Sequence, residues 1–189
     1  MTHTREDAWN LLVKYTKSES LLKHGLGVEQ VMRAMAEKYN EDVEKWGITG
    51  LLHDFDYEAF PTAEEHPYKG NQILKEFGWA DDICEAIMGH AEYTNVARDS
   101  LMAKSLFAVD ELIGLVFAVT YVRPSRSIME VSAKSVKKKF KQKSFAASVS
   151  REDILLGLEE LNLEMDVHFQ FVIDALKGKA ETLGLAGVE

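Results

Sequence analysis

The stretch GLLHDFDYE, residues 50–58, carries the strongest fold signal in this chain. Its adjacent His53 and Asp54 belong to a series of nitrogen and oxygen donors that recur within otherwise apolar sequence. Burying such side chains is costly unless they form hydrogen bonds or hold a cation. Their spread along the chain therefore predicts a metal site that several helices assemble. The candidate metal ligands are His24, His53, Asp54, His66, His90 and Asp110.

Apolar residues recur at three- and four-residue intervals through most of the chain, a spacing typical of helices that bury one face. Only three prolines interrupt it, and no alternating strand pattern or hairpin signal is present. The sequence predicts an all-α, single-domain helical bundle over residues 1–189 with a central metal site. We expect its core at about 19–122 and a helical extension at about 123–185. The expected helices cover residues 5–15, 19–39, 41–53, 67–77, 80–93, 100–121 and 133–142, with a final helical region at 150–183.

Composition narrows the class of protein. The 189 residues are 46% hydrophobic and 28% charged, ordinary globular values that leave room for a buried core. The net charge of -9 argues against binding a nucleic acid polymer, because a phosphate backbone favours a basic surface. The single cysteine, Cys84, cannot form an internal disulfide, which favours a reducing, cytoplasmic location. We find no secretory leader and no apolar run long enough to span a bilayer, so we expect no membrane partner.

The candidate ligands face the expected interior. His24, His90 and Asp110 each lie on the apolar stripe of their helix. His66 precedes Pro67, which biases it away from helical geometry and places it at a helix start. A lone inward histidine is more often a hydrogen-bonded core residue than a ligand. Several inward donors on separate helices are harder to explain in that way, and a divalent cation would neutralise the carboxylates and use the imidazoles.

The order of these residues resembles the HD-domain superfamily of metal-dependent phosphohydrolases. The superfamily signature H…HD…D reads here as His24, His53, Asp54 and Asp110, within about residues 21–120. The resemblance implies that these four residues hold a first divalent ion, and that His53 and Asp54 form the catalytic pair. Members with two further histidines bind a second ion through them, and His66 and His90 match those positions. The resemblance therefore implies two ions, with Asp54 bridging them.

The same resemblance implies a hydrolase that cleaves a phosphate ester of a small soluble substrate, such as a nucleotide, by a metal-activated water. The pair is not followed by Gly-Lys and no GYP motif is present, which counts against the cyclic-dinucleotide phosphodiesterase branch. Mixed imidazole and carboxylate ligation favours Mn, Fe, Co, Ni or Zn, and suits Mg less well. Two alternatives stay open: a di-iron oxygenase on the same fold, and a non-catalytic nucleotide-binding regulatory protein. The oligomeric state is open as well.

Several charged residues outside the set of metal ligands are candidates for binding the substrate or orienting a ligand. Lys69, Arg123 and Arg126 are the candidates for binding the non-reacting phosphate oxygens of the substrate. Four acidic residues near the ligands in sequence could orient an imidazole, namely Asp56, Glu58, Glu65 and Glu92. The stretch KSVKKKFKQK, residues 134–143, could steer an anionic substrate, although a solvated helix face is the commoner role of such a run.

Overall fold

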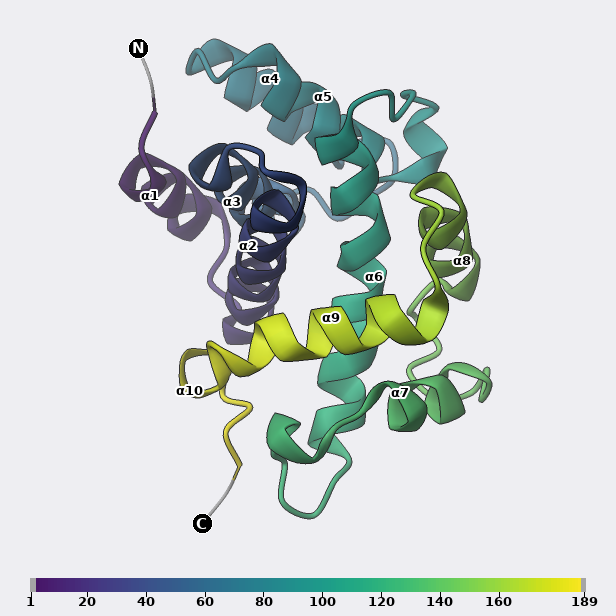
Figure 1. Ribbon diagram of the computed structural model, residues 1–189. Helices are drawn as coiled ribbons and strands as arrows, with labels where there is room; N and C mark the ends of the chain where they lie inside the picture. Colours follow the sequence, from purple (N-terminus) through teal and green to yellow (C-terminus); the bar gives the residue numbers. More distant parts are fainter. Residues whose placement is uncertain (1–2, 188–189) are drawn as a thin grey trace. The chain divides into compact units, whose positions relative to one another are not determined.

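The computed structural model describes residues 3–187, and within them the fold is helical and forms no strand, as the sequence predicts (Figure 1). Two 3-10 turns, Glu92–Thr94 and Ile128–Glu130, and an isolated bridge between Ser127 and Ala186 accompany the helices. The α-helices are α1 (Arg5–Tyr15), α2 (Glu19–Tyr39), α3 (Val43–Leu52), α4 (Tyr68–Glu76), α5 (Asp81–Gly89), α6 (Leu101–Tyr121), α7 (Ala133–Phe140), α8 (Arg151–Glu160), α9 (Met165–Lys177) and α10 (Ala180–Leu183).

Side-chain caps explain where several helices begin. The Thr4 hydroxyl accepts the backbone N–H of Asp7, and the Asp7 carboxylate accepts the backbone N–H of Thr4, a reciprocal pair that starts α1. Asp42 caps α3 and Ser150 caps α8, each accepting a backbone N–H three residues ahead. These starts therefore follow from local sequence.

Some helix ends differ from the sequence expectation. α5 stops at Gly89 rather than near residue 93, because the His90 side chain donates to the Ile87 carbonyl and closes the last turn. The expected final helical region divides into α8, α9 and α10. Its first break lies at Asn162, which has a left-handed backbone conformation with φ of 50°.

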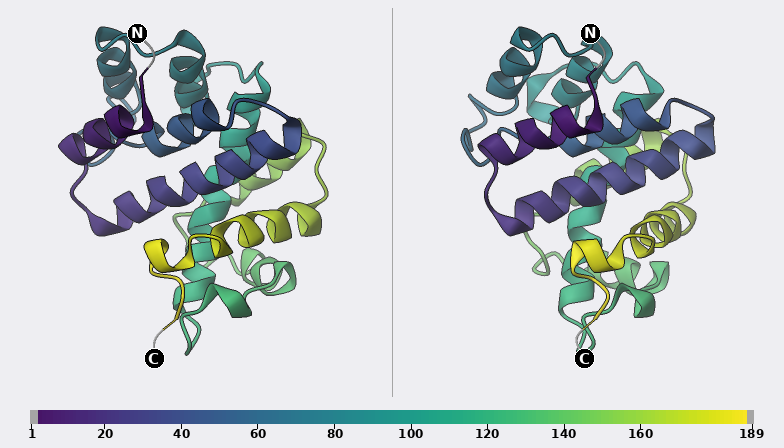
Figure 2. Two further views of the ribbon diagram at one scale, coloured as in Figure 1. Left: turned by 60° about the vertical axis from the view of Figure 1, so that its left-hand side comes forward. Right: turned by 90° about the vertical axis from the view of Figure 1, so that its left-hand side faces the viewer.

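The chain divides into two compact units, and the first extends to Phe107. Its centre is the packing of α2 on α3, the most extensive contact between two helices in the unit (Figure 2). Gly50 permits this approach, because a Cβ there would lie 2.9 Å from the Val28 carbonyl oxygen. α1 packs on α3, and Arg5 of α1 holds the buried Glu29 of α2 through two bonds of 2.6 and 2.7 Å. Packing and a paired buried charge thus fix the three helices together.

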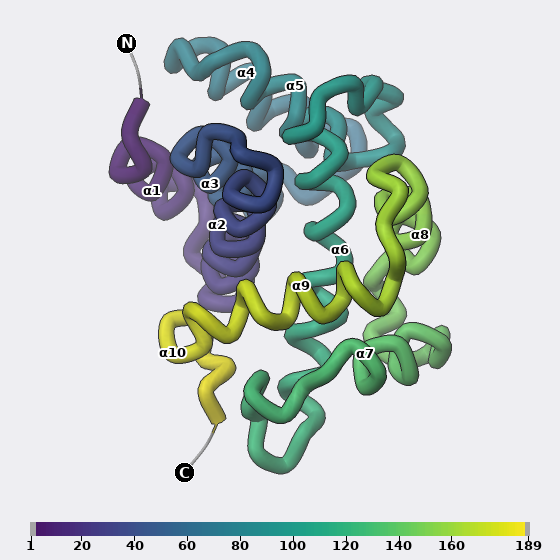
Figure 3. Tube along the Cα trace, in the orientation of Figure 1, coloured from purple at the N-terminus to yellow at the C-terminus, as the bar shows by residue number. Residues whose placement is uncertain are grey.

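The second unit begins at Ala108. α7 contacts α9 (Figure 3). At this contact the ring centroids of Phe140 and Phe169 are 5.9 Å apart. Gly157 of α8 lies so close to α6 that a Cβ there would stand 2.7 Å from the Ala108 Cα. His168 of α9 is buried, and its Nε2–H donates to the Ala108 carbonyl oxygen at 3.0 Å. These contacts gather α7, α8 and α9 into one packed group with the second half of α6.

The division between the units falls inside α6, between Phe107 and Ala108, whereas the sequence places its boundary near residue 123. The single-domain organisation and the extent of the core stay predictions. None of the helices within residues 3–187 combines the length and the apolar character needed to cross a bilayer.

Candidate metal centre

His53 is held at the C-terminal end of α3. Its Nδ1–H donates to the Gly50 carbonyl oxygen at 2.7 Å, one of the carbonyls that the last helical turn leaves without a partner. This bond fixes the ring and leaves Nε2 as the nitrogen with a lone pair. That Nε2 lies 3.4 Å from Oδ2 of Asp54, and the His53 side chain is fully buried.

His90 repeats this arrangement at the C-terminal end of α5. Its Nδ1–H donates to the Ile87 carbonyl oxygen, again three residues back. Its Nε2 lies 3.2 Å from Oδ1 of Asp54. Two helix ends therefore present equivalent imidazole nitrogens to the two oxygens of one carboxylate.

His66 is oriented by a carboxylate rather than by a carbonyl. Its Nδ1–H donates to Oδ1 of Asp56 at 2.8 Å, and its Nε2 lies 3.2 Å from Oδ1 of Asp54. Asp56 is fully buried, and its Oδ2 accepts the backbone N–H of Gly70 at 2.7 Å. A Cβ on Gly70 would lie 2.5 Å from the Asp56 Cγ, so only glycine permits this contact. Asp56 thus has its two oxygens fixed, one by α4 and one by His66.

The donors form two groups that share Asp54. One group contains His24, His53 and Asp54, and the other contains Asp54, His66 and His90. Within each group, one ligand atom from every residue lies within 4.8 Å of the others. His24 comes from α2, and its ring centroid is 5.1 Å from that of His53. A carboxylate common to two donor groups is the arrangement expected of a residue that bridges two ions.

The chemistry of the donors fits divalent cations. His53, His66 and His90 all use Nδ1–H as a donor elsewhere, so all three turn Nε2 toward the Asp54 carboxylate. A proton on His66 Nε2 supplies one positive charge there, and once it is displaced all three nitrogens present lone pairs. Acceptors at 3.2 to 3.4 Å repel one another unless positive charge lies between them. Imidazole nitrogen and carboxylate oxygen are ligands that borderline divalent metals accept.

The close contacts between these carboxylates and imidazoles shift the pKa values of Asp54 and His66. Burial would raise the pKa of Asp54, but His53, His66 and His90 outweigh burial and hold this pKa well below its usual range. Burial would lower the pKa of His66, yet hydrogen bonds to Asp54 and Asp56 raise it to about 9. A proton on His66 therefore balances part of the carboxylate charge at neutral pH.

The structure places the other predicted site residues outside these two groups. Asp110 lies half-buried on α6 in the second unit, and its part in a first ion site stays a prediction. Lys69 is exposed on α4, and Arg126 is exposed with a left-handed backbone. Arg123 lies 3.8 Å from a Glu130 carboxylate oxygen. Substrate binding by these three cations stays a prediction.

Of the four acidic residues that could orient an imidazole, Asp56 does so. Glu58 instead accepts the backbone N–H groups of Lys17 and Ser18, ahead of α2. The other two bond elsewhere, Glu65 with Thr62 and Glu92 with Arg98. Their sequence positions alone did not separate them, because the choice depends on how the loop after α3 turns back on α4.

Two tyrosines beside His66 were not predicted. The Tyr57 ring meets the His66 ring edge-on at 5.2 Å, and the Tyr93 hydroxyl donates to the His66 carbonyl oxygen at 2.7 Å. Both keep about half of their surface exposed, at 41% and 46%. Burial, together with the charges of Asp54 and Asp56, raises the pKa of Tyr93 to about 12, so its hydroxyl stays a donor. Their positions next to Asp56 and near His90 are the only signals in the sequence.

Comparison with known proteins finds similarity over part of the chain. Two curated relatives, each named ribonuclease Y, come from Nitratidesulfovibrio vulgaris strains DP4 and Hildenborough. Each is 34% identical over 76 residues, which is 40% of this chain. The chain spans only 15% of the length of these relatives. No solved structure matches the chain at a significant level.

The family comparison covers the donors themselves. The model of the HD domain family matches residues 21–115, half of the chain, and this segment contains every predicted metal ligand. With His and Asp donors converging on Asp54 inside the matched segment, the chain belongs to the HD domain family.

Proposed function

We propose that the protein hydrolyses a phosphate ester of a small soluble substrate, using two divalent ions that share Asp54. The observation that carries this proposal is the convergence of three imidazole nitrogens and two carboxylate oxygens within 3.2 to 3.4 Å. Divalent ions at such a site shield the charge of a phosphoryl group and make water a better nucleophile at neutral pH.

The protein's own residues have distinct tasks in this proposal. Asp54 would be shared by the two ions, with His24 and His53 holding the first and His66 and His90 the second. Asp110 is the proposed further ligand of the first ion. The metals that best suit these donors are Mn, Fe, Co, Ni or Zn, with Mg less suited. The half-exposed rings of Tyr57 and Tyr93 favour a substrate that presents a planar group beside the phosphate.

Elemental analysis of protein purified without chelator tests the ion count. We expect about two ions per chain, and about one in His66→Ala, which removes a ligand of the second position only. A single ion in the unaltered protein would remove His66 and His90 from the ligand set.

Activity is tested with phosphomonoesters, phosphodiesters, nucleotides and a short RNA, each with Mn, Co, Ni or Mg. We expect turnover of small phosphate esters, and its loss in both His53→Ala and Asp54→Ala. Glu58→Gln is the matched control, because Glu58 binds backbone N–H groups ahead of α2 and lies outside both donor groups. Unchanged turnover in both alanine variants would refute the catalytic role.

The same panel separates the alternatives. Cleavage of RNA alone would point to a polymer substrate like that named for the curated relatives. Iron retention with oxygen uptake, and no phosphate release, would support the di-iron oxygenase. Binding of nucleotides without turnover would support the regulatory protein.

A further inference from the structure

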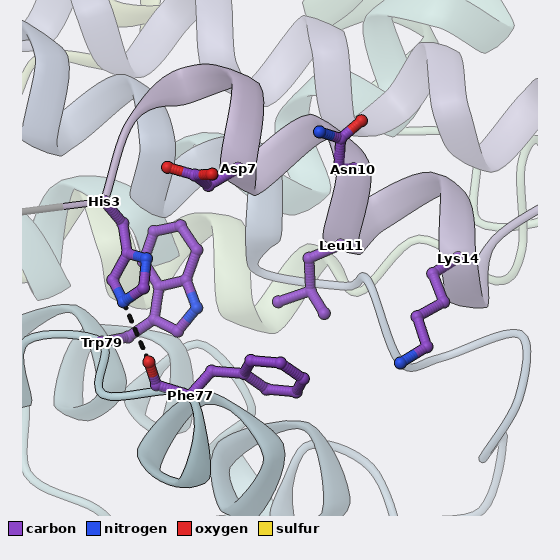
Figure 4. Close-up of a pocket in the computed structure, with 7 residues that line it drawn as sticks. All are labelled: His3, Asp7, Asn10, Leu11, Lys14, Phe77 and Trp79. Atoms are coloured by element: carbon purple, nitrogen blue, oxygen red, sulfur yellow. Dashed lines mark hydrogen bonds between the residues drawn. The ribbon is translucent and has the colours of Figure 1, made fainter.

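A cavity of about 290 Å³ lies in the first unit, between α1 and the turn that joins α4 to α5 (Figure 4). Leu11 extends from α1 toward the ring of Phe77, which lies across from it. The indole of Trp79 closes one end, with the His3 ring stacked on it at 4.2 Å between centroids. The volume is close to the roughly 300 Å³ at which small-molecule sites begin.

The walls of this cavity suit an aromatic ring. Phe77 exposes 54% of its surface although it is large and apolar, while Trp79 is buried at 6%. The two rings and Leu11 offer apolar faces to anything that enters. An inserted ring would cover the exposed face of Phe77 and remove apolar surface from water.

The charges along the cavity favour an anion at one end. Lys14 and Asp7 both line it, and they lie seven residues apart on α1, about 10 Å along the helix axis. The Asp7 carboxylate already accepts the Thr4 hydroxyl at 2.7 Å and the Thr4 backbone N–H at 2.8 Å. The Lys14 ammonium lies 5.3 Å from the centroid of the Tyr15 ring and 5.6 Å from that of the Phe77 ring. Within residues 3–187, no carboxylate pairs with the Lys14 ammonium.

We propose that this cavity binds a small aromatic anion, with the ring between Leu11 and Phe77 and the anionic group on Lys14. The site is separate from the donors around Asp54, and its occupation does not depend on metal or on phosphate chemistry.

The test uses benzoate as the probe and the zinc-loaded full chain, followed by amide and indole nuclear magnetic resonance shifts. We expect millimolar binding, with the largest shifts at Phe77, Gly78 and the Trp79 indole. Benzamide, which lacks the charge, and cyclohexanecarboxylate, which lacks the aromatic ring, should each bind more weakly. Because benzoate can also bind a metal ion, only the shifts at residues 77–79 report on this cavity.

Two variants separate the contributions of the Lys14 charge and the Phe77 ring to benzoate binding. Lys14→Gln should weaken benzoate roughly fivefold, and Phe77→Ala roughly tenfold, without unfolding the protein, because both side chains are exposed. Lys38→Gln is the matched control, since Lys38 also lies over an aromatic ring, that of Tyr39 at 5.2 Å, but outside the cavity. Absent shifts at residues 77–79, or equal weakening by Lys14→Gln and Lys38→Gln, would overturn the proposal. Equal binding of benzoate and cyclohexanecarboxylate would refute its aromatic part.

Discussion

At the scale of single residues, the three imidazoles around Asp54 differ in what orients them. His53 and His90 donate to carbonyls of their own helices, so their orientation follows from helix geometry. His66 depends on another side chain, Asp56, which in turn depends on the close approach of Gly70. The second donor group is therefore the more sensitive to substitutions outside the ligands.

Metal uptake should release protons in a pH-dependent way. With a pKa of about 9, His66 is protonated at pH 7, and an ion can bind its Nε2 only by displacing that proton. We expect release of about one proton from His66 when the second ion binds below pH 9. This release should disappear as the pH rises above 9. Calorimetry in buffers of different ionisation enthalpy measures it.

Asp56→Asn is the informative variant for this effect. It removes one of the two carboxylates that raise the pKa of His66, so less proton should be released at pH 7. Affinity for the second ion should fall by roughly 10- to 100-fold. Glu58→Gln should change neither quantity. The same proton release in Asp56→Asn as in the unaltered protein would show that Asp56 does not control His66.

At the scale of helices, the approach of α2 to α3 positions the first donor group. His24 is on α2 and His53 ends α3, and Gly50 lies where the two backbones come closest. Gly50 also supplies the carbonyl that His53 uses. Gly50 therefore affects both the packing of α2 on α3 and the orientation of the His53 ring.

Gly50→Ala should destabilise the protein and disturb the first ion position. The added Cβ would lie 2.9 Å from the Val28 carbonyl oxygen and 3.0 Å from the Met32 Cγ, so the helices must separate. We expect a loss of about 1–3 kcal/mol, measured by denaturant unfolding. Gly114→Ala is the control, because its Cβ would meet only Val149 Cγ2, at an ordinary 3.6 Å. It should be neutral or stabilise by up to about 1 kcal/mol. Equal effects of the two substitutions would exclude close packing as the cause.

Sequence reasoning predicted these elements well where the pattern is local. The predicted bounds of the first two helices, residues 5–15 and 19–39, agree with α1 and α2, because apolar spacing marks both helices clearly. The structure brings together His24, His53, His66 and His90, of which His24 lies on α2, His53 and His90 end α3 and α5, and His66 precedes α4. What escaped prediction depends on tertiary contacts that no local pattern encodes.

The misses show this dependence at particular residues. Which of the four carboxylates orients His66 depends on the loop after α3, because this loop brings Asp56 to the backbone N–H of Gly70. The early end of α5 is an exception, because it coincides with a local bond from the His90 side chain to the Ile87 carbonyl that apolar spacing does not reveal. Tyr93 reaches the His66 carbonyl across 27 residues of sequence, a contact that no spacing rule anticipates.

At the scale of the whole molecule, the described donor groups gather segments from His24 to His90, most of the first unit. Ions bound only by the folded chain stabilise it by an amount that grows with the logarithm of the ratio of their concentration to the dissociation constant. At a hundredfold excess this is about 2.7 kcal/mol per site. Metal binding and folding of the first unit should therefore be coupled.

Removing metal should lower the melting temperature by roughly 5–10 °C for each ion lost, which scanning calorimetry with and without chelator measures. Asp54→Ala should melt at the same temperature in both conditions, because it loses the carboxylate common to both groups. A chelator effect that persists in Asp54→Ala would place the stabilising ion elsewhere.

The ends of α3 and α5 add one more consequence. The C-terminal end of a helix carries about half a negative charge from its aligned peptide dipoles, and here two such ends meet at Asp54 through His53 and His90. An incoming phosphate would meet backbone repulsion as well as that of the carboxylate. We therefore expect ordered binding, in which the cations bind first and the anionic ester second. The backbone dipoles at the two helix ends contribute to this order.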